Sequence, residues 1–314
     1  MVTMKNLSIE QRINTFSHYY KQKYGRKIFK IGLSTGLECP QRINNNPCLF
    51  CDPMSFIDQH SKKQETITKQ IDYLAKKLMS QYGDIGLIAY FQDNTSTYGD
   101  LDYLAELFIE ADNHALISEL LISTRPDYIY QELLDVIKML KHEVTVELGI
   151  QSKHLKSLQF LNRNHTPDDN ISALNLLKKN HIRTSAHLIL GIPGESKKDI
   201  LQSVQFLTEN GVSEIKFHHL VVYKNTGLAE IYNPDLWKSA YCSFDEYIDL
   251  ISEIVQYINP EIVISRFFTS NISCKKDALN QFSGTKKIWI NQLTKILNEK
   301  NIFQGLLYKK LETT

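Results

Sequence analysis

The chain has 314 residues, 42% of them hydrophobic and 23% charged, which is enough apolar material for one large core with a small appendage. Its 36 basic and 35 acidic side chains leave a formal net charge of +1, so the molecule has no strong overall field to attract a nucleic acid. Residues 1–10 lack a signal-peptide pattern, and no segment approaches the roughly 20 apolar residues of a membrane-spanning helix. We therefore expect a globular protein that is neither secreted nor inserted in a membrane.

Six short runs rich in β-branched or aromatic residues are predicted to be strands. They lack a regular polar alternation, which is typical of parallel strands covered on both faces. In chain order the predicted strands span residues 27–33, 86–91, 119–123, 144–150, 184–190 and 214–222.

Amphipathic stretches between these runs are predicted to be helices, because their apolar residues recur three and four positions apart. They span residues 66–81, 101–111, 168–180 and 198–210. Repeated strand-then-helix order predicts right-handed crossovers and an α/β fold. A closed barrel would need two more strand-helix units, so the sequence favours an open six-stranded (β/α)6 partial TIM barrel.

The pattern changes after Tyr223. Residues 244–258 and 285–300 are predicted helices, and residues 261–266 are predicted to be extended. The expected organisation is an N-terminal segment (1–26), a partial barrel core (27–225) and a small C-terminal α/β extension (226–314).

Three of the five cysteines lie within thirteen residues, directly after the first predicted strand. Cys39, Cys48 and Cys51 have the spacing C-x8-C-x2-C in STGLECPQRINNNPCLFC, where Pro40 and Pro47 prevent a continuous helix. An odd cysteine count with this crowding indicates a reducing compartment, the cytoplasm, and a metal site rather than a disulfide framework. Three thiolates from one loop can hold a cuboidal iron–sulfur cluster and leave one iron without a protein ligand.

A structural zinc site is the alternative that the loop leaves open. Such sites are usually closed by four protein ligands. The nearest candidates for a fourth ligand are His60 and the more distant Cys242 and Cys274.

Eight consecutive segments carry a resemblance to a known family. They are YGRKIFKIGLSTGLECP, CLFC, YFQDNTSTYGD, STRPDYI, VELGIQS, LNRNH, HLILGIPGES and KFHHLVVYKNTGLAEIY. In this order they resemble the YhcC-type (YhcC/YtqA-like) family of radical S-adenosylmethionine (SAM) enzymes, which is related to the catalytic subunit of Elongator. The resemblance implies an open six-stranded barrel in which Cys39, Cys48 and Cys51 hold a [4Fe–4S] cluster at the C-terminal mouth.

The same resemblance implies a set of residues that contact SAM. Phe50 is expected near the adenine, and an arginine suits the carboxylate because its planar fork can bond both oxygens. Glycines would let the backbone come close to a flat ring. The expected contacts are Gln92, Asn94 and Thr95 at the methionyl amine, Glu147, Gln151, Ser152 and Arg163 at the ribose or carboxylate, and Gly191 and Gly194 at the ring.

By resemblance, the reaction is reductive cleavage of SAM to a 5′-deoxyadenosyl radical that abstracts hydrogen from a C–H bond, with flavodoxin or ferredoxin as electron donor. Kinship with Elongator suggests the side chain of a tRNA wobble uridine as substrate. Basic residues in 21–30 and at Lys275, Lys276, Lys286 and Lys287 could contact RNA or could simply be solvated. The alternatives are a radical SAM enzyme acting on a small metabolite or protein residue, and a zinc-stabilised, non-catalytic RNA-binding protein.

Several further residues could face the barrel mouth. Because side chains alternate along a strand, at most one of His218 and His219 is expected to point inward. Lys216 is a candidate beside them, and Arg125 and Asp127 are either substrate-facing or a local salt bridge. Tyr90 is expected in the core, Tyr98 is left open, and Cys242 and Cys274 are given no role.

Overall fold

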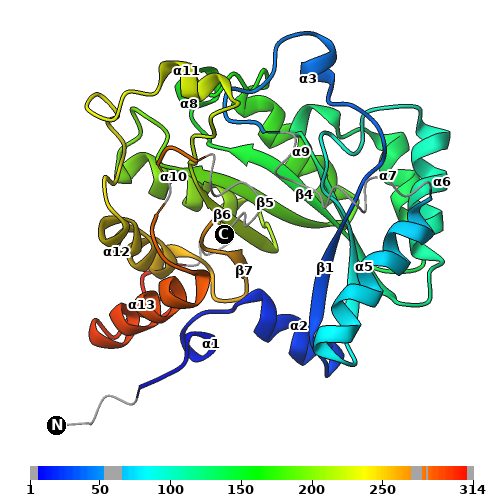
Figure 1. Cartoon of the computed structure of the whole chain (residues 1–314), viewed down its shortest axis with the longest axis horizontal. Coiled ribbons are helices and arrows are strands. Elements are labelled where there is room, and N and C mark those ends of the chain that lie inside the picture. The colour runs from blue at the N-terminus through cyan, green and yellow to red at the C-terminus, as the bar shows by residue number, and fades with distance from the viewer. Residues whose placement is uncertain (1–5, 53–65, 270–277, 281, 310–314) are drawn as a thin grey trace.

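Seven parallel strands form one sheet in the computed structural model, which describes residues 6–52, 66–269, 278–280 and 282–309. The strands follow one another in chain order, and the sheet curves into an open barrel (Figure 1). They are β1 (Ile28–Leu33), β2 (Gly86–Phe91), β3 (Ile117–Thr124), β4 (Val144–Gln151), β5 (Arg183–Leu190), β6 (Glu214–His219) and β7 (Val263–Arg266). The predicted α/β partial barrel is confirmed.

Helices follow most of the strands and cover the outer face of the sheet. They are α1 (Ile9–Arg12), α2 (Phe16–Tyr24), α3 (Pro40–Ile43), α5 (Ile67–Tyr82), α6 (Leu101–Asp112), α7 (Gln131–Lys138), α8 (Leu155–Phe160), α9 (Pro167–Lys179), α10 (Lys197–Glu209), α11 (Gly227–Ile231), α12 (Phe244–Ile254) and α13 (Lys286–Glu299), with 3-10 turns η2 (Pro126–Tyr128) and η3 (Val255–Tyr257). The main core lies between these helices and the sheet. Among the described helices, none is long and apolar enough to cross a membrane.

Local sequence signals set several helix ends. Capping boxes begin α9, where Thr166 pairs with Asp169, and α10, where Ser196 pairs with Asp199. Each cap satisfies backbone N–H groups that the first helical turn leaves unpaired. These caps place the helix starts one residue before the predicted positions, 168 and 198.

The strand count is the main difference from the prediction. Six strands were expected, and the seventh, β7, comes from the segment that the sequence indicated only as an extended part of the C-terminal extension. Val263 and Ile264 of β7 pair in parallel with Glu214 and Ile215 of β6. A four-residue strand gives too short a pattern to reveal its partner. The extension therefore continues the barrel sheet, and the domain boundary near residue 225 stays a prediction.

Helix α2 covers the amino end of the barrel, opposite α3 (Figure 1). Its Tyr20 hydroxyl donates to the buried Glu119 carboxylate at 3.1 Å, and Lys23 pairs with the same carboxylate. Deeper in the barrel, Lys30 pairs with Glu214 at 2.7 Å. These charged groups pair with one another and fill the amino end of the barrel. The open route into the barrel is therefore at its carboxyl end.

An aromatic cluster joins the C-terminal helices to the barrel. The ring centroid of Phe268 lies 5.5 Å from that of Trp289 in α13 and 5.8 Å from that of Tyr247 in α12. His219 of β6 packs on this cluster, 5.6 Å from the Tyr247 ring. This packing fixes β7 and the end of β6 against α12 and α13.

Candidate active site

A cavity of about 340 Å³ opens at the carboxyl ends of the strands. Enzymes with parallel α/β barrels place their sites at this end, because loops that follow several strands meet there. The lining comes from the cysteine loop and from β2 to β7. It includes Cys39, Cys48, Phe50, Cys51, Gln92, Asn94, Thr95, Glu147, Gln151 and Arg163 among the residues that the sequence predicted.

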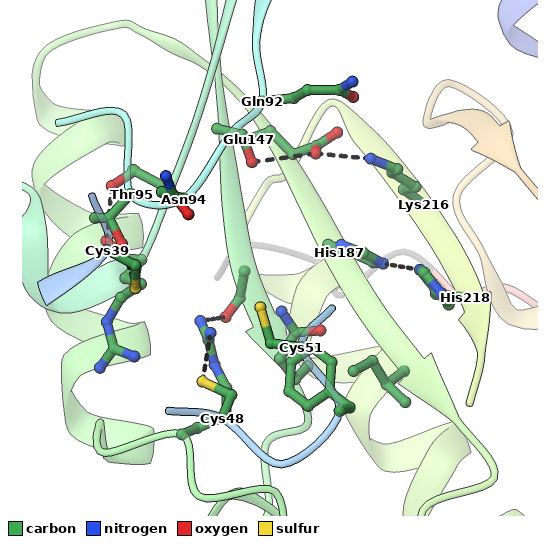
Figure 2. A pocket seen from close by; sticks show the side chains of 18 of the residues that line it. Cys39, Cys48, Cys51, Gln92, Asn94, Thr95, Glu147, His187, Lys216 and His218 are labelled. Atoms are coloured by element: carbon green, nitrogen blue, oxygen red, sulfur yellow. Dashed lines mark hydrogen bonds and ion pairs between the residues drawn. The ribbon is translucent and has the colours of Figure 1, made fainter. Parts of the chain in front are cut away.

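The three cysteines of the loop line this cavity as free thiols. Cys39 directly precedes α3, and a tight turn brings the Cys51 N–H to 3.1 Å from the Cys48 carbonyl oxygen. Figure 2 shows the three side chains around the cavity. The cysteine spacing thus brings all three thiols to one cavity, as predicted.

Two arginines approach the cysteine sulfurs. The Arg42 guanidinium donates to Cys51 Sγ at 2.9 Å, and Arg163 donates to Cys48 Sγ at 3.5 Å. Burial raises the pKa of the Cys51 thiol to about 12, although Arg42 opposes this shift. Thiolates are the form that binds metal, and bound metal displaces the thiol proton. The arginines supply positive charge where thiolates would form.

The donor set fits an iron–sulfur cluster better than a closed zinc site. In residues 6–52, 66–269 and the described part of 278–309, no group of three His, Cys, Asp or Glu side chains forms a ready metal-ion site. The fit therefore rests on the chemistry of three free thiols that face one cavity. Thiolate ligands suit iron–sulfur clusters, and a three-thiolate set leaves one iron open.

The cavity also holds buried polar atoms without hydrogen-bond partners in the described part of the chain. They are Arg125 Nη1, Glu147 Oε2, Gln151 Oε1 and Arg163 Nε. Such atoms are rare in proteins, and each one indicates a missing polar partner. The set offers both donors and acceptors, which fits a polar cofactor such as SAM.

Two of the predicted cofactor contacts have left-handed backbone conformations. Asn94 has φ +54° and Gln151 has φ +64°, values that are uncommon for residues other than glycine. The Asn94 side chain accepts a hydrogen bond from Arg42 at 3.1 Å and donates to the Leu37 carbonyl at 2.7 Å. Strained conformations of this kind persist where the surroundings enforce them and cluster at ligand sites.

The floor of the cavity holds a buried ion pair. Lys216 Nζ lies 2.9 Å from Glu147 Oε1 (Figure 2). The Tyr90 hydroxyl also donates to this carboxylate oxygen. Burial alone would raise the pKa of Glu147, but Lys216 and Lys30 lower it to about 2. Burial lowers the pKa of Lys216 to about 8, against the opposing effect of Glu147. Both groups are therefore charged at neutral pH.

Two histidines meet on the wall of the cavity. His218 Nδ1 lies 3.0 Å from His187 Nε2, and the rings stack with centroids 5.0 Å apart. Burial, with smaller effects from neighbouring charges, holds the pKa of both rings well below the usual range. His218 thus faces the cavity, whereas the next residue, His219, accepts a hydrogen bond from the Thr269 N–H on the opposite face. The predicted alternation is confirmed.

Three of the predicted SAM contacts do not line the cavity. Ser152 is buried, and its hydroxyl donates to Glu195 Oε1 at 2.5 Å. A side chain at Gly191 would meet the ring of Tyr241, with the added carbon 2.5 Å from the hydroxyl oxygen, and Gly194 has open space. The flat ring that approaches Gly191 is therefore a tyrosine of this chain. These three residues lie outside the lining of the cavity, and their contact with SAM stays a prediction.

Gly191→Ala and Gly194→Ala form a matched pair that tests the packing of Tyr241 against Gly191. Both glycines have left-handed φ, +89° and +86°, so alanine strains both positions equally. Only at Gly191 does the new methyl group also collide with Tyr241. We expect Gly191→Ala to lower the free energy of unfolding by about 1–3 kcal/mol more than Gly194→Ala, measured by urea denaturation. Equal losses would contradict the close approach of Tyr241.

Comparison with known families decides the class. The family model described as the radical SAM superfamily matches residues 34–207, and the model of the radical SAM C-terminal domain matches residues 212–299. The chain belongs to the radical SAM superfamily. It is therefore an enzyme of the class whose cofactors are a [4Fe–4S] cluster and SAM.

Three curated relatives show how far the similarity of this radical SAM chain extends. Uncharacterized protein MJ0486 of Methanocaldococcus jannaschii is 31% identical over 91% of this chain and 89% of its own length. Protein YhcC of Escherichia coli strain K12 is 29% identical over 84% and 85%. The tRNA uridine(34) acetyltransferase of Methanocaldococcus jannaschii is 30% identical over 63% of this chain but only 35% of its own length. The YhcC-type resemblance is confirmed.

A solved structure shares the fold. Elp3 of Methanocaldococcus infernus, with residues 1–46 deleted, superposes with a TM-score of 0.64 at 19% sequence identity. The match covers 88% of this radical SAM chain and 64% of the Elp3 chain. This chain thus spans less than two-thirds of that protein.

Some residues of the radical SAM cavity were missed or left open by sequence reasoning. Tyr90 belongs to a buried core cluster, as expected, and it also lines the cavity. Arg125 pairs with Asp127 through two hydrogen bonds at 2.9 Å and 2.8 Å. Unforeseen lining residues include Arg42, His187 and Arg266. Strand alternation on β5 was the available signal for His187. The candidates His60, Cys274, Lys275 and Lys276 lie outside the described residues, and Cys242 is exposed.

Proposed function

We propose that Cys39, Cys48 and Cys51 hold the [4Fe–4S] cluster of this radical SAM enzyme, and that it modifies the side chain of a wobble uridine in tRNA. The observation that carries the cluster assignment is the convergence of three free thiols on one cavity at the barrel mouth. When bound, the cluster supplies an electron that cleaves SAM and yields a 5′-deoxyadenosyl radical for C–H abstraction.

The chain's own residues bind, orient and shield. Asn94 and Gln151, held in strained conformations, present their amides to the cofactor, and Phe50 offers an aromatic face. Thr95 Oγ1 lies 3.7 Å from Cys39 Sγ, and both Thr95 and Gln92 line the cavity. Arg163 and Glu147 are assigned to the polar groups of SAM because each keeps a buried atom that has no hydrogen-bond partner among the described residues. Toward the amino end of the barrel, an ion pair joins Lys30 of β1 to Glu214 of β6.

The tRNA assignment is supported by the relative that acts as a tRNA uridine(34) acetyltransferase, whose similarity covers 205 residues. The N-terminal basic stretch gives little support, because Lys23, Arg26 and Lys30 all pair with carboxylates. Paired cations contribute little field for a phosphate backbone. We place the protein in the cytoplasm, where a flavodoxin or ferredoxin would act as electron donor.

The test uses anaerobically reconstituted protein with SAM, dithionite and total tRNA from a strain that lacks this gene. We expect 5′-deoxyadenosine formation to rise when the tRNA is added, together with a mass change in a position-34 nucleoside. The control is tRNA from a strain that keeps the gene, which should stimulate less. Cleavage of SAM without any effect of tRNA would overturn the RNA assignment and favour a metabolite or a protein residue.

A further inference from the structure

Three chemically active side chains form one row across neighbouring strands. His187 of β5 is the register partner of Lys216 of β6, and Lys216 is the register partner of Arg266 of β7. Register partners on adjacent strands lie about 5 Å apart and point to the same face. All three residues line the cavity. Figure 2 shows Lys216 and the histidine pair on one side of the cavity, with Cys39 on the other.

The charges of this row do not balance within the described part of the chain. Lys216 is neutralised by Glu147 at 2.9 Å, and Arg125 elsewhere in the cavity is neutralised by Asp127 at 2.8 Å. Arg266 is half-buried, and none of the described carboxylates lies within ion-pair distance of its guanidinium. Glu147 therefore compensates Lys216 alone, and the positive charge of Arg266 is left without a carboxylate among the described residues. A partly buried charge without a partner is costly.

The neighbouring histidines add one outward donor. Burial keeps both imidazoles neutral, so each ring carries a single N–H. The contact between His187 Nε2 and His218 Nδ1 uses one N–H and one lone pair. Whichever ring donates, the pair presents one N–H and one lone pair to the cavity. A ligand that accepts hydrogen bonds would select the tautomer that directs the N–H toward it.

We propose that Arg266 and the His187–His218 pair bind a carboxylate group carried by the substrate. The planar fork of a guanidinium matches both oxygens of a carboxylate, and one surplus positive charge balances one negative charge. A phosphate dianion calls for two positive charges, whereas in this row of described residues only Arg266 lacks a carboxylate, because Lys216 pairs with Glu147. The inference rests on the proposed function in one respect, since the substrate is taken to enter this cavity.

The test measures binding of acetate, with inorganic phosphate as the competing probe, to the reconstituted protein in the presence of SAM. Saturation-transfer NMR of ¹³C-labelled acetate gives Kd for the wild type and for Arg266→Gln, Arg266→Lys and Arg26→Gln. Arg26 is the matched control because it is an arginine on the outer surface, paired with Asp84. We expect Arg266→Gln to raise the acetate Kd at least about tenfold, Arg266→Lys less, and Arg26→Gln not at all.

Unchanged acetate binding in Arg266→Gln, or equal weakening in Arg26→Gln, would overturn the proposal. Tighter binding of phosphate than of acetate, lost in Arg266→Gln, would overturn the carboxylate assignment. If Arg266→Gln fails to fold, Arg266→Lys decides, because it keeps the charge and loses the fork. Acetate binding is measured without turnover, and SAM cleavage is measured without acetate. Loss of acetate binding would therefore contradict the carboxylate site alone, and loss of SAM cleavage would contradict the proposed function alone.

Discussion

Cys48→Ala is expected to abolish reductive SAM cleavage. Cys48 is buried at the cavity and comes from the same tight turn as Cys51, so its loss removes one of three proposed cluster ligands. We expect bound iron to fall and 5′-deoxyadenosine formation to drop more than about 100-fold, exceeding the roughly 10–100-fold loss seen for outer-shell partners of metal sites. Iron analysis and chromatographic detection of 5′-deoxyadenosine measure both quantities.

Cys242→Ala is the matched control for this variant. Cys242 is an exposed free cysteine and lies outside the lining of the cavity. Its replacement should leave iron content and SAM cleavage at wild-type values. Full activity in Cys48→Ala, or equal losses in both variants, would contradict the assignment of the cluster to the loop.

Glu147→Gln is expected to cause the largest loss of stability. The carboxylate is 1% exposed, and it compensates Lys216, which is 7% exposed. Removing one partner of a buried ion pair leaves an uncompensated charge, which typically costs about 3–5 kcal/mol. We expect a loss of that size in the free energy of unfolding, measured by urea denaturation at pH 7.

The destabilisation caused by Glu147→Gln is expected to depend on pH. In the wild type the pKa of Lys216 is about 8, below its ordinary 10.5, so the unfolded chain binds more protons between these values and stability rises with pH there. Without Glu147 the pKa of Lys216 falls further, so this rise begins at a lower pH. The deficit of Glu147→Gln should therefore shrink as pH rises toward 8.

The double variant Glu147→Gln/Lys216→Met separates the loss of charge compensation from the change in packing. It removes both charges, so most of the lost stability should return. A double variant as unstable as the sum of the two single variants would show that the pair is not coupled. In that case the floor of the cavity would owe its stability to packing alone.

Much of the barrel was predictable from the sequence, because β-branched runs and amphipathic stretches alternate with little ambiguity. Strands β2 and β4 were placed to within one residue of their bounds, and the cysteine spacing identified the loop that faces the cavity. The end of β6 was placed three residues too late, at Val222 instead of His219. Leu220, Val221 and Val222 continue the apolar run beyond the strand, so composition alone gives no boundary.

The missed parts of the site depend on register between distant segments. Arg266 lies fifty residues beyond Lys216, and only the parallel pairing of β7 with β6 brings the two side chains together. Gly191 and Ser152 follow strands, as cofactor contacts often do. Gly191 instead packs against the ring of Tyr241, and the Ser152 hydroxyl donates to Glu195. Strand ends show where a site lies, whereas the direction of each side chain depends on tertiary packing.

The most direct test of the central claim is electron paramagnetic resonance of the reduced, reconstituted wild-type protein before and after SAM is added. The account predicts about four irons and four sulfides per chain, as one [4Fe–4S] cluster requires. It also predicts a reduced cluster whose signal shifts when SAM binds the open iron, with 5′-deoxyadenosine as product. Bound zinc, or an iron–sulfur signal that SAM leaves unchanged, would contradict the assignment of an open cluster to Cys39, Cys48 and Cys51.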